Sequence, residues 1–234
     1  MMNFLTLSPN HNKKEKLKNF FRQFENIFFF SKLQKEIEDS KSVLDVGCGN
    51  DSPMGHLKRT FRSEGIDIYP KCVQVSRKNR YHDSYRLGDV RKLSKYYKNK
   101  SWDTLVSIDV IEHLNKQESL KMISQMEKIA RKKVILMTPK GYIDQGAYDG
   151  NPYQVHHSGW TKKDLENLGY KVYGLRGFKY LRNDAATIRF SPWIFWGFLS
   201  FITEVLLYPF PDLSFQLFAV KSVTSDGPRN KIAE

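Results

Sequence analysis

Residues Val43–Asp51 read VLDVGCGND, and this stretch decides the fold. An apolar run ends around Asp45, and Gly47 and Gly49 follow with one residue between them. The apolar run predicts a short buried strand. The two glycines allow the backbone to turn sharply and to approach a ligand, because neither carries a Cβ. Ligands bind at the carboxyl ends of strands in open parallel sheets, so we expect a ligand site directly after this strand.

Short apolar segments alternate with helical patterns from Val43 onward, and this order predicts an α/β fold with a mostly parallel sheet and helices on both faces. The expected strands cover residues 42–47, 65–70, 85–90, 104–108, 132–139, 171–178 and 214–222. The expected helices cover residues 54–61, 71–79, 116–131 and 161–170.

The chain is expected to consist of three segments: an N-terminal extension, the α/β domain and a C-terminal tail. Residues 1–41 are expected to form an N-terminal helical extension, because apolar residues recur at three- and four-residue spacing. Those residues are Leu17, Phe20, Phe21, Phe24, Ile27 and Phe28. Residues 42–224 are the expected domain, and residues 225–234 read as a flexible tail.

The formal net charge of the 234 residues is +13, which favours an anionic partner such as a phosphorylated substrate, a nucleic acid or an acidic membrane. A lysine-rich surface without such a partner explains the charge equally well, and no arginine-rich stripe is interleaved with aromatics. Cys48 and Cys72 form no C-x-x-C pair, so no zinc or redox motif is offered. The first 20 residues lack the pattern of a secretory signal, which predicts a cytoplasmic protein.

Acidic residues stand at the ends of three successive expected strands. A dinucleotide site would require a third glycine where Ser52 stands, and the Asp45 carboxylate would repel a pyrophosphate. Asp45 instead suits a cationic ligand, such as an amino-acid ammonium beside a sulfonium. Asp67 is placed to accept the hydroxyls of a ribose, and Asp89 to read an adenine amino group. Together the three acids predict a cofactor site.

Four segments of the chain resemble the class I S-adenosylmethionine-dependent methyltransferases: VLDVGCGND, GIDIYP, GDV and DTLVSIDVIEHL. The resemblance implies a Rossmann-like, seven-stranded sheet whose last strand is antiparallel, and S-adenosyl-L-methionine as the cofactor. It implies the following cofactor-binding residues: Asp45, Gly47, Cys48, Gly49, Asp67, Ile68, Asp89, Val90 and Ile108.

Asp109 and three histidines are the candidate catalytic residues. The resemblance places Asp109 beside the transferred methyl group and the substrate. A neutral histidine suits base catalysis near pH 7, and His113, His156 and His157 are the candidates. His113 has an alternative role as a hydrogen-bonding residue at a helix start.

DVIEH also resembles the E-x-x-E-H pattern of metal-dependent O-methyltransferases that act on small-RNA ends or quinone precursors. Asp109, Glu112, His113 and a later histidine would then hold a divalent metal. The first acid is Asp rather than Glu, which shortens its reach, and the same letters occur in family members without a metal. A divalent metal is therefore possible but not favoured, and the metal ligands are left unassigned.

A strongly apolar segment, about residues 189–212, precedes the last expected strand, and between Arg189 and Asp212 the only charge is Glu204. Two prolines bracket this run and Glu204 interrupts it, so it is not expected to span a membrane. Three alternatives remain open: a helical hairpin over the substrate end of the site, a dimer or core contact, and a membrane-interface contact through residues 190–211. In the last, Trp193, Trp196 and Tyr208 would lie at headgroup level. The basic charge favours a protein peripheral on the inner membrane face.

The leading hypothesis is a methyltransferase for oxygen atoms of a small or lipid-linked acceptor (glycan, isoprenoid or lipid) near a membrane. The second is a metal-assisted O-methyltransferase for RNA ends or a quinone precursor, which chelator sensitivity would distinguish. The third is a binding module without chemistry, which the intact cofactor acids disfavour. The oligomeric state is not predicted.

Overall fold

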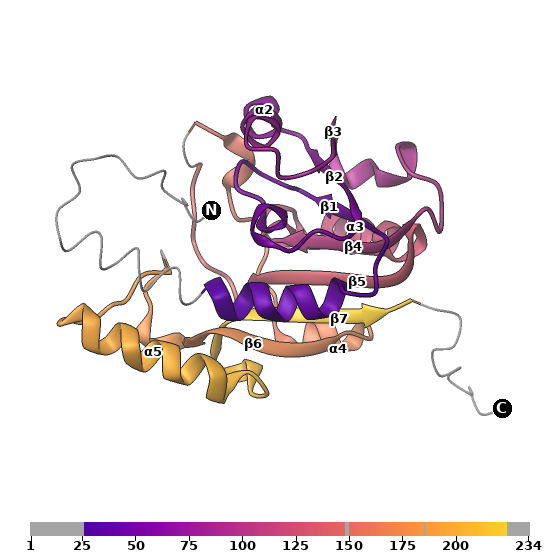
Figure 1. Cartoon of the computed structure of the whole chain (residues 1–234). Coiled ribbons are helices and arrows are strands. Elements are labelled where there is room, and N and C mark those ends of the chain that lie inside the picture. Colours follow the sequence, from indigo (N-terminus) through magenta and orange to yellow (C-terminus); the bar gives the residue numbers. More distant parts are fainter. Residues whose placement is uncertain (1–25, 148–149, 185, 224–234) are drawn as a thin grey trace.

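The computed structural model describes residues 26–147, 150–184 and 186–223 (Figure 1). The expected helical pattern before residue 26 and the expected tail at 225–234 lie outside these residues. A seven-stranded sheet forms the centre of the molecule, in the order β3-β2-β1-β4-β5-β7-β6. The strands are β1 (Ser42–Val46), β2 (Arg62–Asp67), β3 (Ser84–Leu87), β4 (Trp102–Ile108), β5 (Ala130–Pro139), β6 (Lys171–Phe178) and β7 (Ser214–Ser222).

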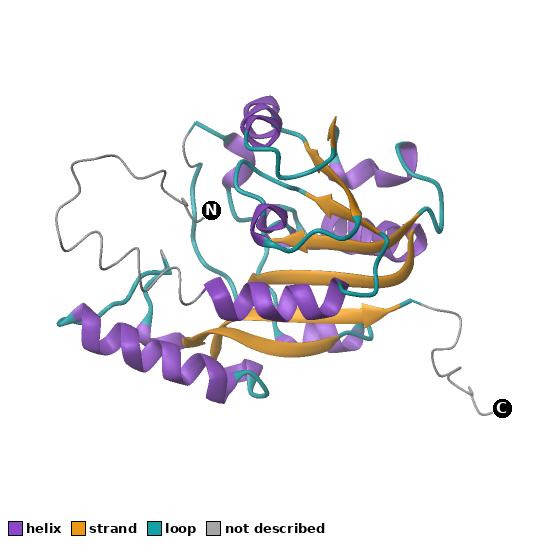
Figure 2. Cartoon of the chain, viewed as in Figure 1, coloured by secondary structure: helices purple, strands orange, loops and turns teal. Residues whose placement is uncertain are grey.

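The first five strands are parallel, whereas β7 runs antiparallel to both β5 and β6. Helices flank the strand layer on both sides (Figure 2). The α-helices are α2 (Pro70–Lys78), α3 (Lys116–Ile129), α4 (Lys162–Asn167) and α5 (Trp193–Leu207), preceded by a helix described over residues 26–37. The predicted Rossmann-like fold, its N-terminal helix and its antiparallel last strand are confirmed.

Alternate residues of each strand pack on opposite faces of the sheet, as the pleat requires. On β5, Val134 and Leu136 join α3 and α4 in one core, whereas Ile135 and Met137 face the helix of residues 26–37 in a second core. Both faces of β5 are therefore buried, which explains its continuous apolar run from Val134 to Met137.

The expected helix over residues 54–61 is wrong. Only Pro53–His56 forms a short 3-10 turn, η1, and β2 already begins at Arg62. Leu57 has extended backbone angles, and the N–H of Lys58 donates to the Gln34 side chain, 2.8 Å away, on the helix of residues 26–37. Met54 and Phe61 are nevertheless buried, in one cluster with Phe29, Leu33 and Ile37 of this N-terminal helix.

The apolar insertion between β6 and β7 forms one α-helix, α5, followed by a 3-10 turn, η6 (Pro211–Leu213). It is not the helical hairpin of the first alternative. None of the helices in the described ranges is both long and apolar enough to cross a bilayer.

We expect Gly174→Ala in β6 to destabilise the fold by about 1–3 kcal/mol, because overpacking forces neighbours to move. A Cβ there would lie 1.9 Å from Ser214 Oγ and 2.7 Å from the Leu207 carbonyl oxygen. Gly197→Ala is the matched control: a Cβ in this part of α5 meets nothing within 4 Å, so a gain of about 0.5–1 kcal/mol is expected. Urea unfolding of both variants measures the difference, and equal stabilities would contradict the packing of β6 against β7.

Candidate active site

A cavity of about 260 Å³ opens at the carboxyl ends of β1, β2 and β4. From β1 the chain proceeds outward through β2 and β3, and then returns to β4 and β5 on the other side. This reversal makes the β1–β4 boundary the switch point at which open α/β sheets bind ligands. The predicted site residues that line the cavity are Asp45, Gly47, Cys48, Gly49, Asp67, Ile68, Asp89, Val90, Ile108, Asp109, His113 and His157.

The turn after β1 leaves room only for glycine at its first position. Gly47 has a φ of +79°, a left-handed conformation that other residues rarely adopt, and a Cβ there would lie 2.5 Å from Val110 Cγ2. Gly49 also has a positive φ, of +59°. The backbone of this turn consequently borders the cavity closely enough to contact a ligand.

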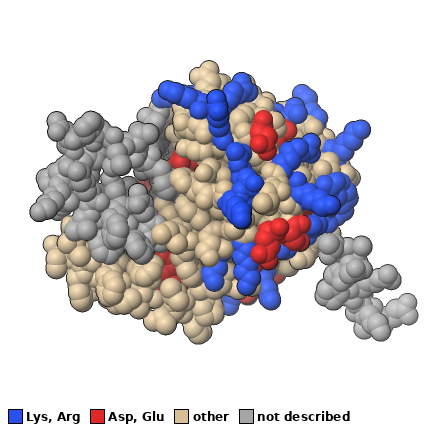
Figure 3. Space-filling model, viewed as in Figure 1, with Lys and Arg blue, Asp and Glu red and all other residues tan. Residues whose placement is uncertain are grey.

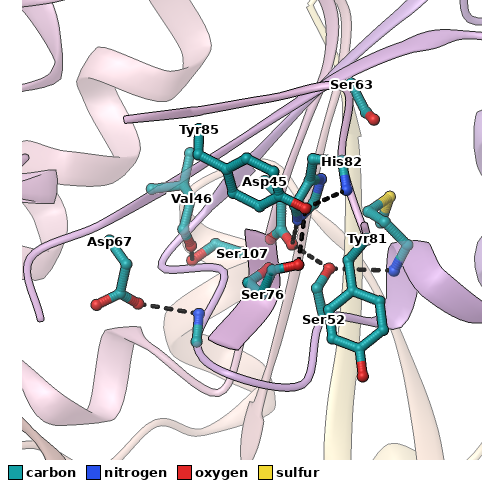
Figure 4. Close-up of polar contacts among 12 residues, drawn as sticks. Asp45, Val46, Ser52, Ser63, Asp67, Ser76, Tyr81, His82, Tyr85 and Ser107 are labelled. Carbon is teal, nitrogen blue, oxygen red and sulfur yellow. Dashed lines mark hydrogen bonds and ion pairs between the residues drawn. The ribbon is translucent and has the colours of Figure 1, made fainter. Parts of the chain in front are cut away.

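Asp67, at the end of β2, anchors this turn (Figure 4). Its Oδ2 accepts the N–H of Gly49 at 2.9 Å, and its Oδ1 accepts the N–H of Tyr69 at 2.8 Å. Burial raises the pKa of the carboxyl, while these two backbone N–H groups act in the opposite direction. Each carboxylate oxygen has a second lone pair, so Asp67 can also accept two ribose hydroxyls.

Asp45 lies on β1, almost fully buried, and the Ser52 side chain orients its carboxylate (Figure 4). The Ser52 hydroxyl donates to its Oδ2 at 2.6 Å, and Nε2 of the buried His82 lies 3.3 Å from the same oxygen. His82 was not found from the sequence, because it lies in a loop before β3 and belongs to no motif. Ser52 stands where a dinucleotide-binding motif has its third glycine, and here its hydroxyl orients the Asp45 carboxylate.

The Asp89 carboxylate forms an ion pair with Arg91. Its carboxylate receives the guanidinium of Arg91 through Nε and Nη2, each at 2.9 Å. Burial raises the pKa of Asp89, but the bonds from Arg91 outweigh it and leave the pKa lowered. An adenine amino group would therefore share these oxygens with Arg91, a feature the sequence did not indicate.

Asp109, directly after β4, is fixed by a chain of polar contacts. Its φ of +52° is unusual for a non-glycine residue, and burial raises the pKa of its carboxyl. Gln216 on β7 donates to Asp109 Oδ1 at 2.9 Å, and Arg176 on β6 donates to Gln216 Oε1 at 3.2 Å. The Arg176 N–H in turn donates to Glu204 on α5, 3.2 Å away. The antiparallel strands β6 and β7 thus bring residues without any motif to the site.

Glu112, His113 and His156 form a compact cluster beside Asp109. One potential ligand atom from each lies within 4.8 Å of the others. Burial raises the pKa of Glu112 to about 8 and lowers the pKa of His113 to about 4. Glu112 Oε2 accepts the Thr138 hydroxyl at 2.9 Å, whereas its buried Oε1 has no hydrogen-bond partner.

Both histidines of this cluster contact a backbone carbonyl through Nδ1: His113 with Val155 at 3.3 Å and His156 with Ile143 at 2.8 Å. A carbonyl only accepts, so Nδ1 carries the proton and Nε2 keeps its lone pair in the neutral ring. These residues fit a divalent cation, because metal-binding histidines are oriented by such second contacts. They equally fit a proton acceptor.

The structure separates the two adjacent histidines. His156 is buried, stacks edge-on against His113 with 4.7 Å between ring centroids, and does not line the cavity. His157 is exposed and lines the cavity. Its backbone N–H donates to the Glu112 carbonyl at 2.8 Å, which fixes the loop over the site.

A seven-stranded sheet of this topology, with carboxylates around a cavity at its switch point, is the arrangement expected of a Rossmann-like domain that binds S-adenosylmethionine. Residues 44–138 match the family model described as a methyltransferase domain. The chain is 31% identical over 98 residues to norajmaline N-methyltransferase of Rauvolfia serpentina, covering 38% of this chain and 32% of that protein. The chain spans only 32–61% of the length of the curated relatives it matches.

Solved structures share the fold. The methyltransferase domain of bacterial CtHen1 aligns with a TM-score of 0.52 at 17% identity, over 85% of this chain and 99% of that chain. Magnesium protoporphyrin IX methyltransferase of Synechocystis with bound S-adenosylmethionine aligns with a TM-score of 0.51 at 18% identity, over 92% and 86% of the two chains. Residues 44–138 therefore match a methyltransferase domain, and these solved structures share the fold of the chain.

Proposed function

We propose that this chain methylates an oxygen atom of a small or lipid-linked acceptor close to a membrane. The observation that carries the proposal is the joint lining of one cavity by the cofactor acids and by proton-accepting groups. Asp45 and Asp67 lie at one side of this cavity, and Asp109, His113 and His157 also line it. Such a site can hold a cofactor and deprotonate a second molecule.

The Gly47–Gly49 turn, whose backbone lines the cavity, and the spare acceptor capacity of Asp67 fit S-adenosylmethionine. When bound, that cofactor supplies a methyl group already activated by a sulfonium. The Gly47–Gly49 turn and Asp67 would hold its amino-acid and ribose parts. Burial lowers the pKa of His113 to about 4, so the ring is neutral at pH 7 and its Nε2 lone pair can accept a hydrogen bond from an acceptor hydroxyl and orient it for transfer.

The apolar part of the lining supports an acceptor with an apolar portion. Phe29 and Phe30, from the helix of residues 26–37, and Tyr153, from the loop after β5, border the same cavity as Asp109. Ligand sites commonly combine apolar walls with few polar groups. A lipid-linked or isoprenoid-like molecule would bury its chain against these aromatic rings.

Transfer of a labelled methyl group to separated cell fractions tests this proposal. The intact chain is incubated with methyl-labelled S-adenosylmethionine and with membrane lipids, RNA, or water-soluble small molecules. We expect label in the organic-extractable lipid fraction, and at least a tenfold lower rate for His113→Gln at unchanged cofactor affinity. Label confined to RNA would contradict the proposed acceptor class.

The Glu112–His113–His156 cluster favours one alternative, a metal-assisted O-methyltransferase acting on RNA ends or a quinone precursor. Its buried, unpartnered Glu112 Oε1 and two neutral histidines offer the mixed oxygen and nitrogen ligands that divalent transition metals accept. The metal would polarise the acceptor oxygen, and Glu112, His113 and His156 would hold it.

Chelation separates the two functions. Under the leading proposal, transfer to the lipid fraction continues after dialysis against EDTA, and Glu112→Gln retains activity. Under the alternative, EDTA abolishes transfer, Mn²⁺ restores it, and Glu112→Gln binds Mn²⁺ at least tenfold more weakly by calorimetry. The calorimetric measurement needs no acceptor, so it reports on the site even when the acceptor is unidentified.

A further inference from the structure

Helix α5 buries polar residues and exposes apolar ones, which is the reverse of an ordinary surface helix. Its buried residues are Gly197, Ser200 and Glu204, which face the protein. They make polar contacts there: Ser200 Oγ accepts Arg182 Nη2 at 2.9 Å, and Glu204 Oε1 accepts the N–H of Arg176 at 3.2 Å. The polar side chains of α5 are thus used to attach it to β6 and the following turn.

The exposed residues of α5 are all apolar, whereas a surface helix normally turns its apolar stripe to the core. Side chains of Phe195, Phe198 and Leu206 are 58%, 54% and 62% exposed. The full set of exposed residues on the helix is Ile194, Phe195, Phe198, Ile202, Val205 and Leu206, and Phe190, Phe210 and Leu213 extend it at either end. We call these nine residues the α5 apolar face. Figure 3 shows this part of the surface almost entirely tan, whereas Lys and Arg gather on the opposite side of the view.

The apolar side chains of the α5 apolar face fit a lipid bilayer better than a protein partner. Protein interfaces carry about one hydrogen bond per 100–200 Å², but no member of the α5 apolar face has a polar side chain. The hydrocarbon boundary of a bilayer requires no such partner. The helix has 15 residues, which at 1.5 Å per residue is about 22 Å, so it suits lying in the plane of a bilayer rather than crossing it.

The ends of α5 carry the groups that prefer the headgroup region. Trp193 and Trp196 lie at its first turn and Tyr208 at its C-terminal end, and such aromatic rings concentrate at membrane interfaces. Lys32 Nζ lies 4.3 Å from the Tyr208 ring centroid, and the exposed Arg189 precedes the helix. Lys32 and Arg189 are thus cations near the two ends of the helix, where they can meet anionic headgroups.

We propose that the α5 apolar face docks on the interfacial layer of an anionic lipid bilayer, with α5 in the membrane plane. The network from Glu204 through Arg176 and Gln216 then connects the docked helix to Asp109 in the cavity. Docking would place the cavity beside the lipid from which a lipid-linked acceptor is drawn. The docking itself depends on neither cofactor nor acceptor.

Vesicle binding without cofactor or acceptor tests this proposal separately from methyl transfer. The intact chain is titrated with vesicles of phosphatidylcholine and phosphatidylglycerol, and with phosphatidylcholine alone. Trp102 and Trp160 are buried in the core, so quenching by acyl-brominated lipid reports on Trp193 and Trp196. We expect binding to the anionic vesicles, quenching of tryptophan fluorescence, and at least tenfold weaker binding to phosphatidylcholine alone.

Paired serine variants supply the control. Phe195→Ser/Leu206→Ser should weaken vesicle binding at least tenfold. Leu87→Ser/Leu120→Ser, which removes exposed apolar side chains from β3 at the far edge of the sheet and from α3, should leave binding within twofold. Thermal unfolding of each variant checks that it folds. Absence of binding by the parent chain, equal binding by both variants, or a dimer that Phe195→Ser/Leu206→Ser dissociates would overturn the proposal.

Discussion

Asp67→Ala should weaken S-adenosylmethionine binding about 100-fold, because the Asp67 carboxylate both anchors the Gly47–Gly49 turn and is expected to bind the ribose. It accepts the N–H groups of Gly49 and Tyr69, and its free lone pairs face the cavity for the ribose hydroxyls. Hydrogen bonds to a charged group are worth about 1.5–3 kcal/mol, so losing the ribose contacts and the turn anchor together accounts for a change of this size. Isothermal calorimetry with the cofactor measures it.

Asp67→Asn is the conservative companion, and Asp144→Ala, at an exposed loop position, is the matched control. The amide can keep one backbone N–H contact but cannot accept at both atoms, so Asp67→Asn should fall between the parent and Asp67→Ala. Asp144→Ala should bind like the parent. Should Asp67→Ala bind within threefold of the parent while remaining folded, the cofactor would not lie against β2.

Arg176→Ala should lower the free energy of unfolding by about 3 kcal/mol, because it removes a buried cation that several elements share. The Arg176 side chain donates to Gln216 Oε1 at 3.2 Å and to Asn26 Oδ1 at 2.7 Å. Burial raises the pKa of Asp109, and the charge of Arg176 opposes that rise. Removing the guanidinium leaves the buried side chains of Asn26 and Gln216 each without one hydrogen bond, and it removes this polar link between the N-terminal helix and β6. Urea unfolding monitored by tryptophan fluorescence measures the change.

Arg189→Ala removes the same charge from an exposed position and should change stability by less than about 0.5 kcal/mol. Arg176→Lys keeps the charge, but an ammonium group cannot donate to Gln216 and Asn26 with the geometry of a guanidinium. We therefore expect an intermediate loss of unfolding free energy. Equal unfolding curves for Arg176→Ala and Arg189→Ala would mean that the network around Asp109 does not hold the site together.

The sequence was sufficient for the parallel half of the sheet and for the residues at its edge. Asp45, Gly47, Asp67 and Asp89 lie at or just beyond the carboxyl ends of β1, β2 and β3, and parallel strands place these ends at one edge of the sheet. The positions of these residues along the chain therefore predict their proximity in space, and the three acids and Gly47 all line the cavity. Their individual roles toward the cofactor stay predictions.

The remaining features depend on contacts between distant segments. Arg176, Gln216 and His82 reach the site through strand pairing or a loop, and no local pattern marks them. The helix expected over residues 54–61 is replaced by a 3-10 turn and extended backbone, and the Lys58 N–H contacts Gln34 in a distant segment that no local pattern indicates. The orientation of α5 was equally hidden, because a helix that is apolar on most sides does not indicate which face packs until Ser200 and Glu204 are seen to face inward.

A crystal structure of the chain soaked with S-adenosylhomocysteine tests the central assignment most directly. We predict density in the cavity between the Gly47–Gly49 turn and Asp67, with both ribose hydroxyls donating to the Asp67 carboxylate. Density for the nucleoside at another place on the molecule, or a ribose with no contact to Asp67, would contradict the account.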